Sequence, residues 1–413
     1  MIVVALMMAT APAMAAGADA TKLSLETAID NALDANLDII SSRNAARSAA
    51  ARVRSADTLP NPVFSFGATS LTPGRQMMPG VSRAGDDVFR IDQPIEMGGK
   101  RRARVAAARD ELAAAGSDVA DTRRQVRAAV TDAWYDLVAA ERRLALYEGI
   151  AQSYRQSQTL AERRLQAGAI SAGDLARQRV EMLRADSDRS RAASDLREAQ
   201  LVVAVLIGHE QDAAALQSIG GGELALGDQA ATGFETLVDM RPDVRAADKR
   251  VSAARNALIG ARALRRPDIS IGAQYEHDNN AAGDSVGVGF SVPLQIGNRY
   301  GGVIDSAGVD LAQAQANAAK IRAVATAEIE TARRAADDAT ARRARFDDDL
   351  LPSARKAAAT AEFAYGRGAL ALVDLLDARR TLQSVELAAI DSRTDEAKAR
   401  ARRIAAETPE QTQ

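Results

Sequence analysis

The stretches "FAYGRGALALVDLLDARR" (363–380) and "ERRLQAGAISAGDLARQR" (162–179) are two copies of one turn. In each copy a glycine, Gly168 or Gly368, precedes an alanine, a branched aliphatic residue and, at matching positions, Asp-Leu. Glycine readily adopts the left-handed backbone that ends a helix, and Ser171 is a suitable N-cap for the helix that follows the first turn. Each stretch therefore predicts the tip of a long helical hairpin.

The duplication extends along most of the chain, and internal repeats of this kind decide the architecture. "NLDI" at 36–39 corresponds to "RPDV" at 241–244, "PVFSFG" at 62–67 to "PDISIG" at 267–272, and "QPIEMGGKR" at 93–101 to "VPLQIGNRY" at 292–300. The landmarks keep their order in both copies. We therefore expect a first structural repeat at 22–207 and a second at 235–405. The Gly-rich segment 208–234 between them is expected to be a linker or a small subdomain.

Composition favours long, closely packed helices over a globular core. Of the 413 residues, 47% are hydrophobic, with alanine predominating, only 3% are aromatic and 26% are charged. Such a mixture is typical of long helices. The net charge of -2 predicts no nucleic-acid partner. The absence of cysteine excludes disulfides, thiolate metal sites and cysteine catalysis.

The first long helix has room to run without interruption. No proline stands between Pro94 and Pro242, and proline is excluded from helix interiors. A seven-residue apolar repeat, typical of a coiled coil, comprises Val105, Leu112, Val119, Val126, Ala133 and Ala140, with a second row at Val130, Leu137 and Leu144. A helix from Met97 to Gly168 would be roughly 100 Å long. Shorter helices, broken at Gly116 and Gly149, are the alternative.

Four short segments alternate apolar and polar residues, at 62–68, 86–93, 268–276 and 285–292. This alternation is typical of strands in an outer-membrane barrel, although a half-buried sheet in a water-soluble domain produces it too. A barrel needs about eight strands or more, and open sheet edges are not tolerated in lipid. If the strands cross a membrane, several copies of the chain must pool them.

The sequence predicts that neither end of the chain belongs to the two repeats. Residues 1–15 contain a short apolar run ending in Ala13-Met14-Ala15, which predicts an exported protein with a cleaved signal peptide. A buried N-terminal strand is the alternative. Residues 406–413 are expected to form a disordered tail.

The duplicated plan, "RPDVRAADKRV" (241–251) before the third strand and the Gly-Asp-Leu tips resemble the outer-membrane efflux family of TolC-like channels. The stretch "QPIEMGGKRRAR" (93–104) looks most like the heavy-metal, CzcC-like branch. The resemblance implies a mostly α-helical fold with a small transmembrane β part. Three copies would form a twelve-stranded β-barrel in outer-membrane lipid and a coiled-coil α-barrel in the periplasm. The implied partners are a periplasmic adaptor (membrane fusion) protein and an inner-membrane RND-type pump.

The same resemblance assigns roles to residues at the tips. Asp374 and Asp377 match the acidic entrance gate, while Asp174 and Tyr365 match positions that hold neighbouring hairpins together. Gly168 and Gly368 mark the tips that dock on the adaptor. Leu370 and Gly173 stand where the family pattern has polar residues, which implies a weaker or different closing contact. From the residues alone, Asp374 is equally well explained as a helix-starting acid that interacts with the helix dipole.

Other chemistry-bearing residues give weaker signals. His209 and His277 lack metal-ligand spacing. The pair Met77-Met78 suits soft metals but falls in a predicted loop, and the acidic run Asp347-Asp348-Asp349 is expected to be a solvated helix bend. We therefore expect no catalytic residues, cofactor or resident metal.

These observations together predict a passive channel that exports divalent heavy-metal cations of the cobalt, zinc and cadmium type. The same channel serving drug efflux or type I protein secretion is the nearer alternative. A periplasmic coiled-coil adaptor is the more distant one, because adaptors normally contain a single hairpin.

Overall fold

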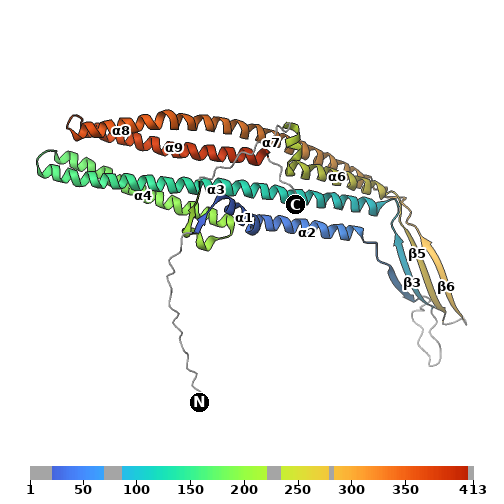
Figure 1. Cartoon of the computed structure of the whole chain (residues 1–413). Helices are drawn as coiled ribbons and strands as arrows, with labels where there is room; N and C mark the ends of the chain where they lie inside the picture. Colours follow the sequence, from blue (N-terminus) through green and yellow to red (C-terminus); the bar gives the residue numbers. More distant parts are fainter. Residues whose placement is uncertain (1–20, 69–85, 221–233, 279–282, 408–413) are drawn as a thin grey trace, which may run out of the picture. The chain divides into compact units, whose positions relative to one another are not determined.

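The computed structural model describes residues 21–68, 86–220, 234–278 and 283–407 (Figure 1). The expected signal segment 1–15 and the pair Met77-Met78 lie outside these residues. The chain forms two compact units. The first, here called the hairpin unit, comprises Met1–Leu37, Arg124–Gln229 and Ile329–Glu407; the second, the sheet unit, comprises Asp38–Arg123, Ala230–Glu328 and Thr408–Gln413.

A single helix, α3 (Lys100–Gln166), runs for 67 residues and contributes to both units. Neither Gly116 nor Gly149 breaks it, so the uninterrupted helix predicted from the proline-free stretch is confirmed. Val126, Val130 and Leu137 of the heptad rows are buried, and Trp134 beside them is fully buried. At Gly168 the chain reverses into α4 (Ala172–Ile207), which completes the first hairpin.

The second repeat reaches its tip differently. Helix α7 (Gly301–Arg345) passes through a π-helical segment, η2 (Phe346–Leu350), into α8 (Leu351–Gly366), and the chain returns as α9 (Leu372–Glu407). In η2 the N–H of Leu351 bonds to the carbonyl of Phe346, five residues back. This wider turn lies immediately before Pro352, a residue that an ordinary helical turn accommodates poorly.

The expectation of a solvated acidic bend is wrong for one of its three residues. Asp348 and Asp349 are exposed, but Asp347 accepts hydrogen bonds from Arg393 at 2.6 Å and from Arg343 at 3.2 Å. The hydrogen bond from Arg393 is the largest influence on the carboxyl of Asp347 and holds its pKa below the usual range. Asp347 therefore ties the π segment to α9.

A small parallel pair, β1 (Thr21–Leu23) and β4 (Leu216–Ser218), completes the hairpin unit together with α1 (Leu25–Ala35) and the 3-10 helix η1 (Glu210–Ala215). The indole N–H of Trp134 donates to the carbonyl of Leu23 at 3.4 Å. Strand β4 lies within the segment 208–234, so part of that segment is ordered against α3.

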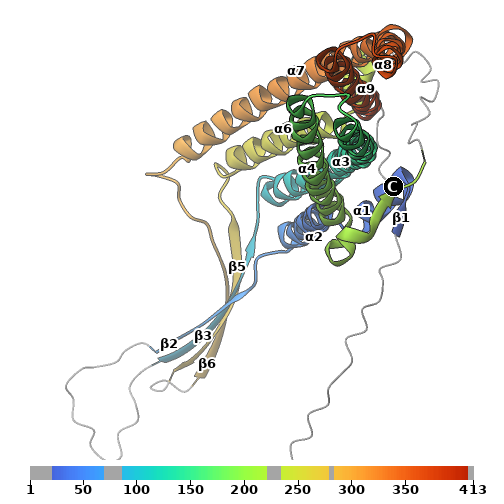
Figure 2. The same ribbon diagram turned by 90° about the vertical axis from the view of Figure 1, so that its left-hand side faces the viewer.

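The sheet unit contains α2 (Leu37–Asp57), α5 (Phe234–Met240) and α6 (Pro242–Ala263). Its four antiparallel strands are β2 (Val63–Ala68), β3 (Asp86–Ile95), β5 (Ile269–Asp278) and β6 (Gly283–Ser291), in the order β2-β3-β5-β6 (Figure 2). The four strands correspond to the four alternating segments of the sequence. In the described chain, β2 and β6 each pair on one side only.

The register of the sheet sorts its side chains by polarity. Phe66, Phe89, Tyr275 and Val286 stand opposite one another across all four strands, and Phe64, Ile91, Ala273 and Val288 form the next such row. Most of these side chains are exposed; Val288 has a relative accessibility of 87%. The residues between the rows are polar or glycine and include the ion pair of Arg90 with Asp92 at 2.6 Å. The predicted alternation is therefore confirmed, and one face of the sheet is apolar across these two central rows, whereas Asp87, His277 and Asp284 follow on the same face toward the loops.

Candidate functional site: the paired hairpin tips

The two tips adopt the same type of backbone turn. Gly168 and Gly368 have φ values of 70° and 75°, in the left-handed region that favours glycine. The amide of Ala169 donates to the carbonyl of Arg164 at 2.8 Å, and the amide of Ala369 donates to that of Ala364 at 2.9 Å. These bonds satisfy carbonyls at the end of the incoming helix, as in a Schellman-type cap.

The first helical turn after each tip differs in its polar chemistry. In the first tip, Ser171 Oγ accepts from the amide of Asp174 at 3.0 Å and donates to its carboxylate at 2.8 Å. Arg177 lies 4.0 Å from the same carboxylate. Asp174 is thus engaged within its own helix, and the local charge is balanced.

The second tip carries alanine and a second acid at the matching positions. Ala371 stands where the first tip has Ser171, and Asp377 where it has Arg177. Asp374 and Asp377 are exposed, three residues apart and so on one side of α9. The carboxylate of Asp374 has no hydrogen bond or ion pair with any part of the chain that the structure describes. The second tip therefore presents two exposed carboxylates, of which Asp374 is unpaired and Asp377 interacts electrostatically with Arg380.

An apolar cluster joins the two hairpins behind the tips. Leu372, Leu375 and Leu376 of α9 are buried against Ala151 and Tyr154 of α3 and Ala185 of α4. Tyr365 and Leu370 pack on its edge. Burial raises the pKa of the Tyr154 hydroxyl above its ordinary value. The cluster buries the side of α9 that carries Leu372, Leu375 and Leu376, so Asp374 and Asp377 remain on the exposed side.

Charged side chains reinforce this contact. Arg379 donates to Glu362 at 2.9 Å and to Ser157 at 3.1 Å, and its guanidinium lies 5.8 Å from the ring of Tyr154. In the same region the guanidinium of Arg164 lies 5.5 Å from the ring of Tyr365. Tyr365, which the sequence assigned to hairpin closure, therefore contacts the other hairpin of its own chain.

Glu181 forms a second link between the hairpins. Its side chain is 9% exposed and accepts from Arg184 of the same helix at 3.0 Å and from Arg380 of α9. The hydrogen bond to Glu181 raises the pKa of Arg380. Sequence reasoning missed Glu181 because the second repeat has threonine at the matching position 381. Arg379 stands at the position that matches Arg179 of the first tip, which gives no indication of its contact with the other hairpin.

A shallow groove of about 500 Å³ runs beside these contacts, between α4 and α9. Its walls include the exposed side chains of Val180 and Val373 together with Leu376. The charged residues Arg177, Arg184 and Arg380 also line it. Both hairpins thus build a surface that combines apolar and basic side chains, with Glu181 held by Arg184 and Arg380.

The weaker candidates gain no support from the geometry. Within the described residues, no three His, Cys, Asp or Glu side chains are grouped so as to hold a metal ion. His277 pairs with Asp284 at 2.7 Å at the far end of the sheet from α6, and His209 precedes η1. No described helix is both long and apolar enough to cross a membrane.

Two long helical hairpins and a sheet with one apolar face define the TolC-like channel fold. The chain matches the structure of CusC with a TM-score of 0.81 and 19% identity, covering 92% of this chain and 91% of that one. It also matches the outer membrane protein VceC of Vibrio cholerae with a TM-score of 0.78 and 20% identity, covering 92% and 95% of the two chains.

The chain belongs to the outer membrane efflux protein family, whose pattern matches residues 28–209 and 235–405. A relative with 27% identity over 361 residues is the cobalt-zinc-cadmium resistance protein CzcC of Cupriavidus metallidurans; the match covers 87% of this chain and 84% of that protein. The family assignment makes the chain an outer-membrane efflux channel and not an enzyme.

Proposed function

We propose that the chain is the exit duct of a tripartite system that exports divalent heavy-metal cations of the cobalt, zinc and cadmium type. The similarity to a cobalt-zinc-cadmium resistance protein over 87% of the chain is the observation that supports this choice of cargo. The exposed acid pair Asp374 and Asp377 agrees with it, because fixed carboxylates attract cations. The two structural repeats, 22–207 and 235–405, supply one hairpin each.

The proposal includes a homotrimer. A four-stranded sheet leaves β2 and β6 with one open edge each in the described chain, and such edges are not tolerated within lipid. Three copies would supply twelve strands, enough to close a barrel whose apolar face meets the membrane. The same symmetry would bring three copies of each tip together at the periplasmic end.

In that trimer, Asp374 and Asp377 would ring the entrance. Six carboxylates around a narrow lumen create a negative field that favours cations and opposes anions, as charged rings do in other pores. The duct is passive, so selection among cations rests with the RND-type pump.

The tips would also receive the periplasmic adaptor. The groove between α4 and α9 lies immediately behind Gly168 and Gly368 and offers both apolar and basic side chains. Adaptor contact would favour a state in which the hairpins at 160–180 and 362–382 move apart, a shift between two populations. Asp174 and Tyr365 are the residues whose contacts this movement would change.

Growth of a deletion strain on cobalt, zinc and cadmium salts and on a panel of drugs tests the cargo. We expect sensitivity to the metals alone, restored by the intact gene. Sensitivity to drugs alone, or loss of a secreted protein without metal sensitivity, would reject metal export in favour of another cargo for the same channel. A protein that fails to form outer-membrane oligomers would reject the duct itself.

A further inference from the structure

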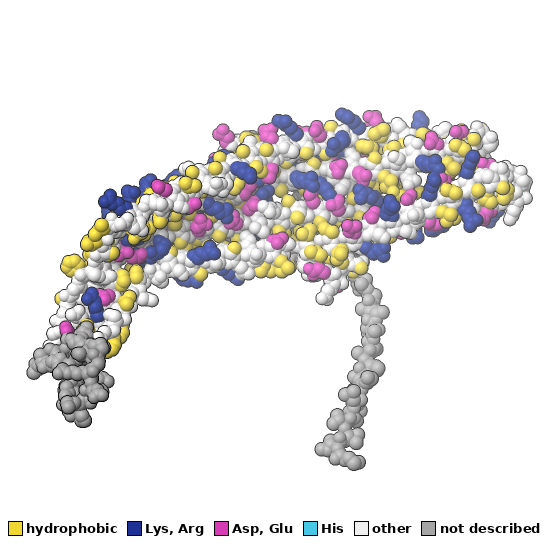
Figure 3. All heavy atoms as spheres, turned by 180° about the vertical axis from the view of Figure 1, so that it is seen from behind, with side chains coloured by type: hydrophobic (Ala, Val, Ile, Leu, Met, Phe, Trp, Pro, Cys, Tyr) yellow, Lys and Arg dark blue, Asp and Glu magenta, His cyan; other side chains and the backbone are white. Residues whose placement is uncertain are grey.

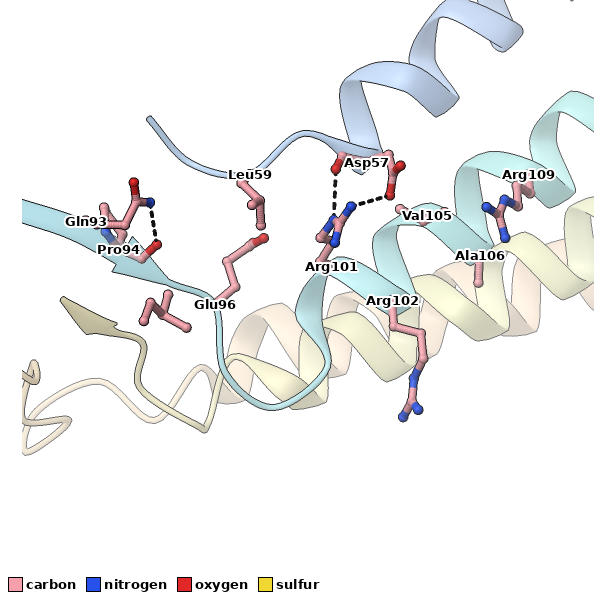
Figure 4. Close-up of a pocket in the computed structure, with 11 residues that line it drawn as sticks. Asp57, Leu59, Gln93, Pro94, Glu96, Arg101, Arg102, Val105, Ala106 and Arg109 are labelled. Atoms are coloured by element: carbon pink, nitrogen blue, oxygen red, sulfur yellow. Dashed lines mark hydrogen bonds and ion pairs between the residues drawn. The ribbon is translucent and has the colours of Figure 1, made fainter. Parts of the chain in front are cut away.

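The sheet unit contains a pocket of about 580 Å³ where β3 passes into α3 (Figure 4). Its apolar part includes Leu59, after α2, and Ile95, at the end of β3; these side chains are 64% and 42% exposed. Ile95 lies on the same side of β3 as Ile91 and Phe89, because side chains alternate along a strand. The pocket therefore opens at the end of the apolar face of the sheet.

The charges that line this pocket are only partly balanced. Arg101 donates to the carboxylate of Asp57 at 2.8 Å, and Glu96 accepts from Arg104 at 2.6 Å. Both acids of the lining are thus already engaged. Arg102 and Arg109 also line it, are exposed, and have no acidic partner within the described residues. In Figure 4, Arg102 extends away from the Arg101–Asp57 pair.

The same end of the sheet carries further basic side chains. Ile95 pairs with Ile269 in the register, so the end of α6 lies beside the start of α3. A Cβ atom on Gly98 would approach Arg266 to 3.0 Å, which shows how closely the two segments pack. The other exposed arginines here without an acidic partner in the described chain are Arg262, Arg265, Arg266 and Arg299. Figure 3 shows Lys and Arg side chains gathered near the upper end of the strands.

We propose that this pocket binds an anionic phospholipid, with the phosphate on Arg102 and Arg109 and an acyl chain along Ile95 and Ile91. Guanidinium groups suit phosphate oxygens, which they can hold through two hydrogen bonds. The apolar wall beside them matches the chain that a lipid headgroup carries. The inference uses the outer-membrane location and does not depend on the cargo.

Titration of the detergent-purified full chain with phosphatidylglycerol or phosphatidylcholine, followed by the thermal midpoint, tests the proposal. We expect phosphatidylglycerol to stabilise the protein more. Each basic residue at an anionic surface usually strengthens binding about fivefold. Arg102→Gln with Arg109→Gln removes two of them and should therefore weaken the apparent affinity for phosphatidylglycerol roughly 30-fold. The charge-keeping pair Arg102→Lys with Arg109→Lys should retain most of the affinity.

The matched control is Arg163→Gln with Arg179→Gln, which removes two exposed arginines of the first hairpin and should leave the affinity unchanged. An equal loss in this control would show a general charge effect and overturn the site. Equal stabilisation by the two lipids would overturn the headgroup assignment, and so would equal stabilisation by inorganic phosphate. A change in oligomer dissociation without lipid preference would assign the pocket to a second copy instead.

Discussion

The two hairpin tips have the same backbone turn but differ in the charges that they expose. Both use a left-handed glycine and matching carbonyl caps. The first tip neutralises Asp174 with Ser171 and Arg177, whereas the second places Asp374 beside Asp377 and leaves both exposed. The repeat thus fixes where the chain turns, and the residues in the following helical turn decide what each tip presents to its surroundings.

The tips also differ in how firmly they are packed. The positions occupied by Leu372, Leu375 and Leu376 in the second tip are Ala172, Leu175 and Ala176 in the first. The three leucines are buried, whereas Ala172 and Ala176 are exposed. The acidic tip is therefore the one whose helix is anchored, which holds its carboxylates in a defined direction.

The largest expected effect concerns that packing. Leu375→Ala should lower the free energy of unfolding by about 3 kcal/mol, because it leaves a cavity in the cluster. Leu175→Ala, at the half-buried counterpart, should cost less than about 1 kcal/mol. Thermal unfolding with hydrogen exchange across α4 and α9 measures both. Equal losses for the two variants would mean that the tips are anchored alike.

The next effect concerns the helices that lead to the two tips. Only the second, α7 with α8, contains a π-helical segment, which Asp347 ties to α9. The pKa of Asp347 is lowered in the folded chain. Its stabilisation is therefore present above the unfolded pKa of about 3.9 and is lost as the pH falls through the folded value. Asp347→Asn should remove about 1–2 kcal/mol at neutral pH and flatten the acid limb of the stability curve.

Asp348→Asn, at the exposed neighbour, is the control and should leave that curve unchanged. Unfolding midpoints measured from pH 7 to pH 3 compare the two variants. A steep acid limb that persists in Asp347→Asn would remove Asp347 from this role.

A smaller effect tests the charge difference between the tips. Asp374→Asn with Asp377→Asn should weaken the block of single-channel current by trivalent cations about tenfold, because both exposed carboxylates are lost. Arg177→Gln in the first tip should leave the block within about twofold. Unchanged block in the double variant would show that the acids lie away from the conduction path.

The smallest effect concerns the cap. Ser171→Ala should destabilise the first turn of α4 by about 1 kcal/mol, since the amide of Asp174 loses its acceptor. Ala371→Ser should protect the first turn of α9 by a similar or smaller amount. Amide exchange of the two turns reports both changes. If Ser171→Ala leaves exchange in α4 unaltered, the cap contributes nothing to the difference between the tips.

Sequence reasoning succeeded where a periodic pattern extends over many residues. The proline-free stretch with heptad rows predicted α3, and the two-residue alternation predicted the four strands and their apolar face. Glycines at matching positions predicted both turns. These features depend on local geometry, which the order of residues specifies directly.

It failed where the structure depends on partners distant in the chain. Asp347 looked solvated because Arg393, its main partner, lies on another helix. Strands β1 and β4 are three residues each, too short for any alternation to be recognised. The gate and docking roles of Asp374, Asp377, Asp174 and Tyr365 remain predictions, since they concern surfaces that other molecules would meet.

The π segment has a further consequence for the second hairpin. One extra residue in a helix rotates everything beyond it by about 100° around the axis. Tyr365 and Ala361, which lie on α8 beyond η2, face the apolar cluster in that rotated setting. Deleting a single residue from 346–350 would turn this end of α8 by a quarter revolution or more and point those side chains elsewhere. The direction in which the acidic tip is held is therefore set several turns away from it.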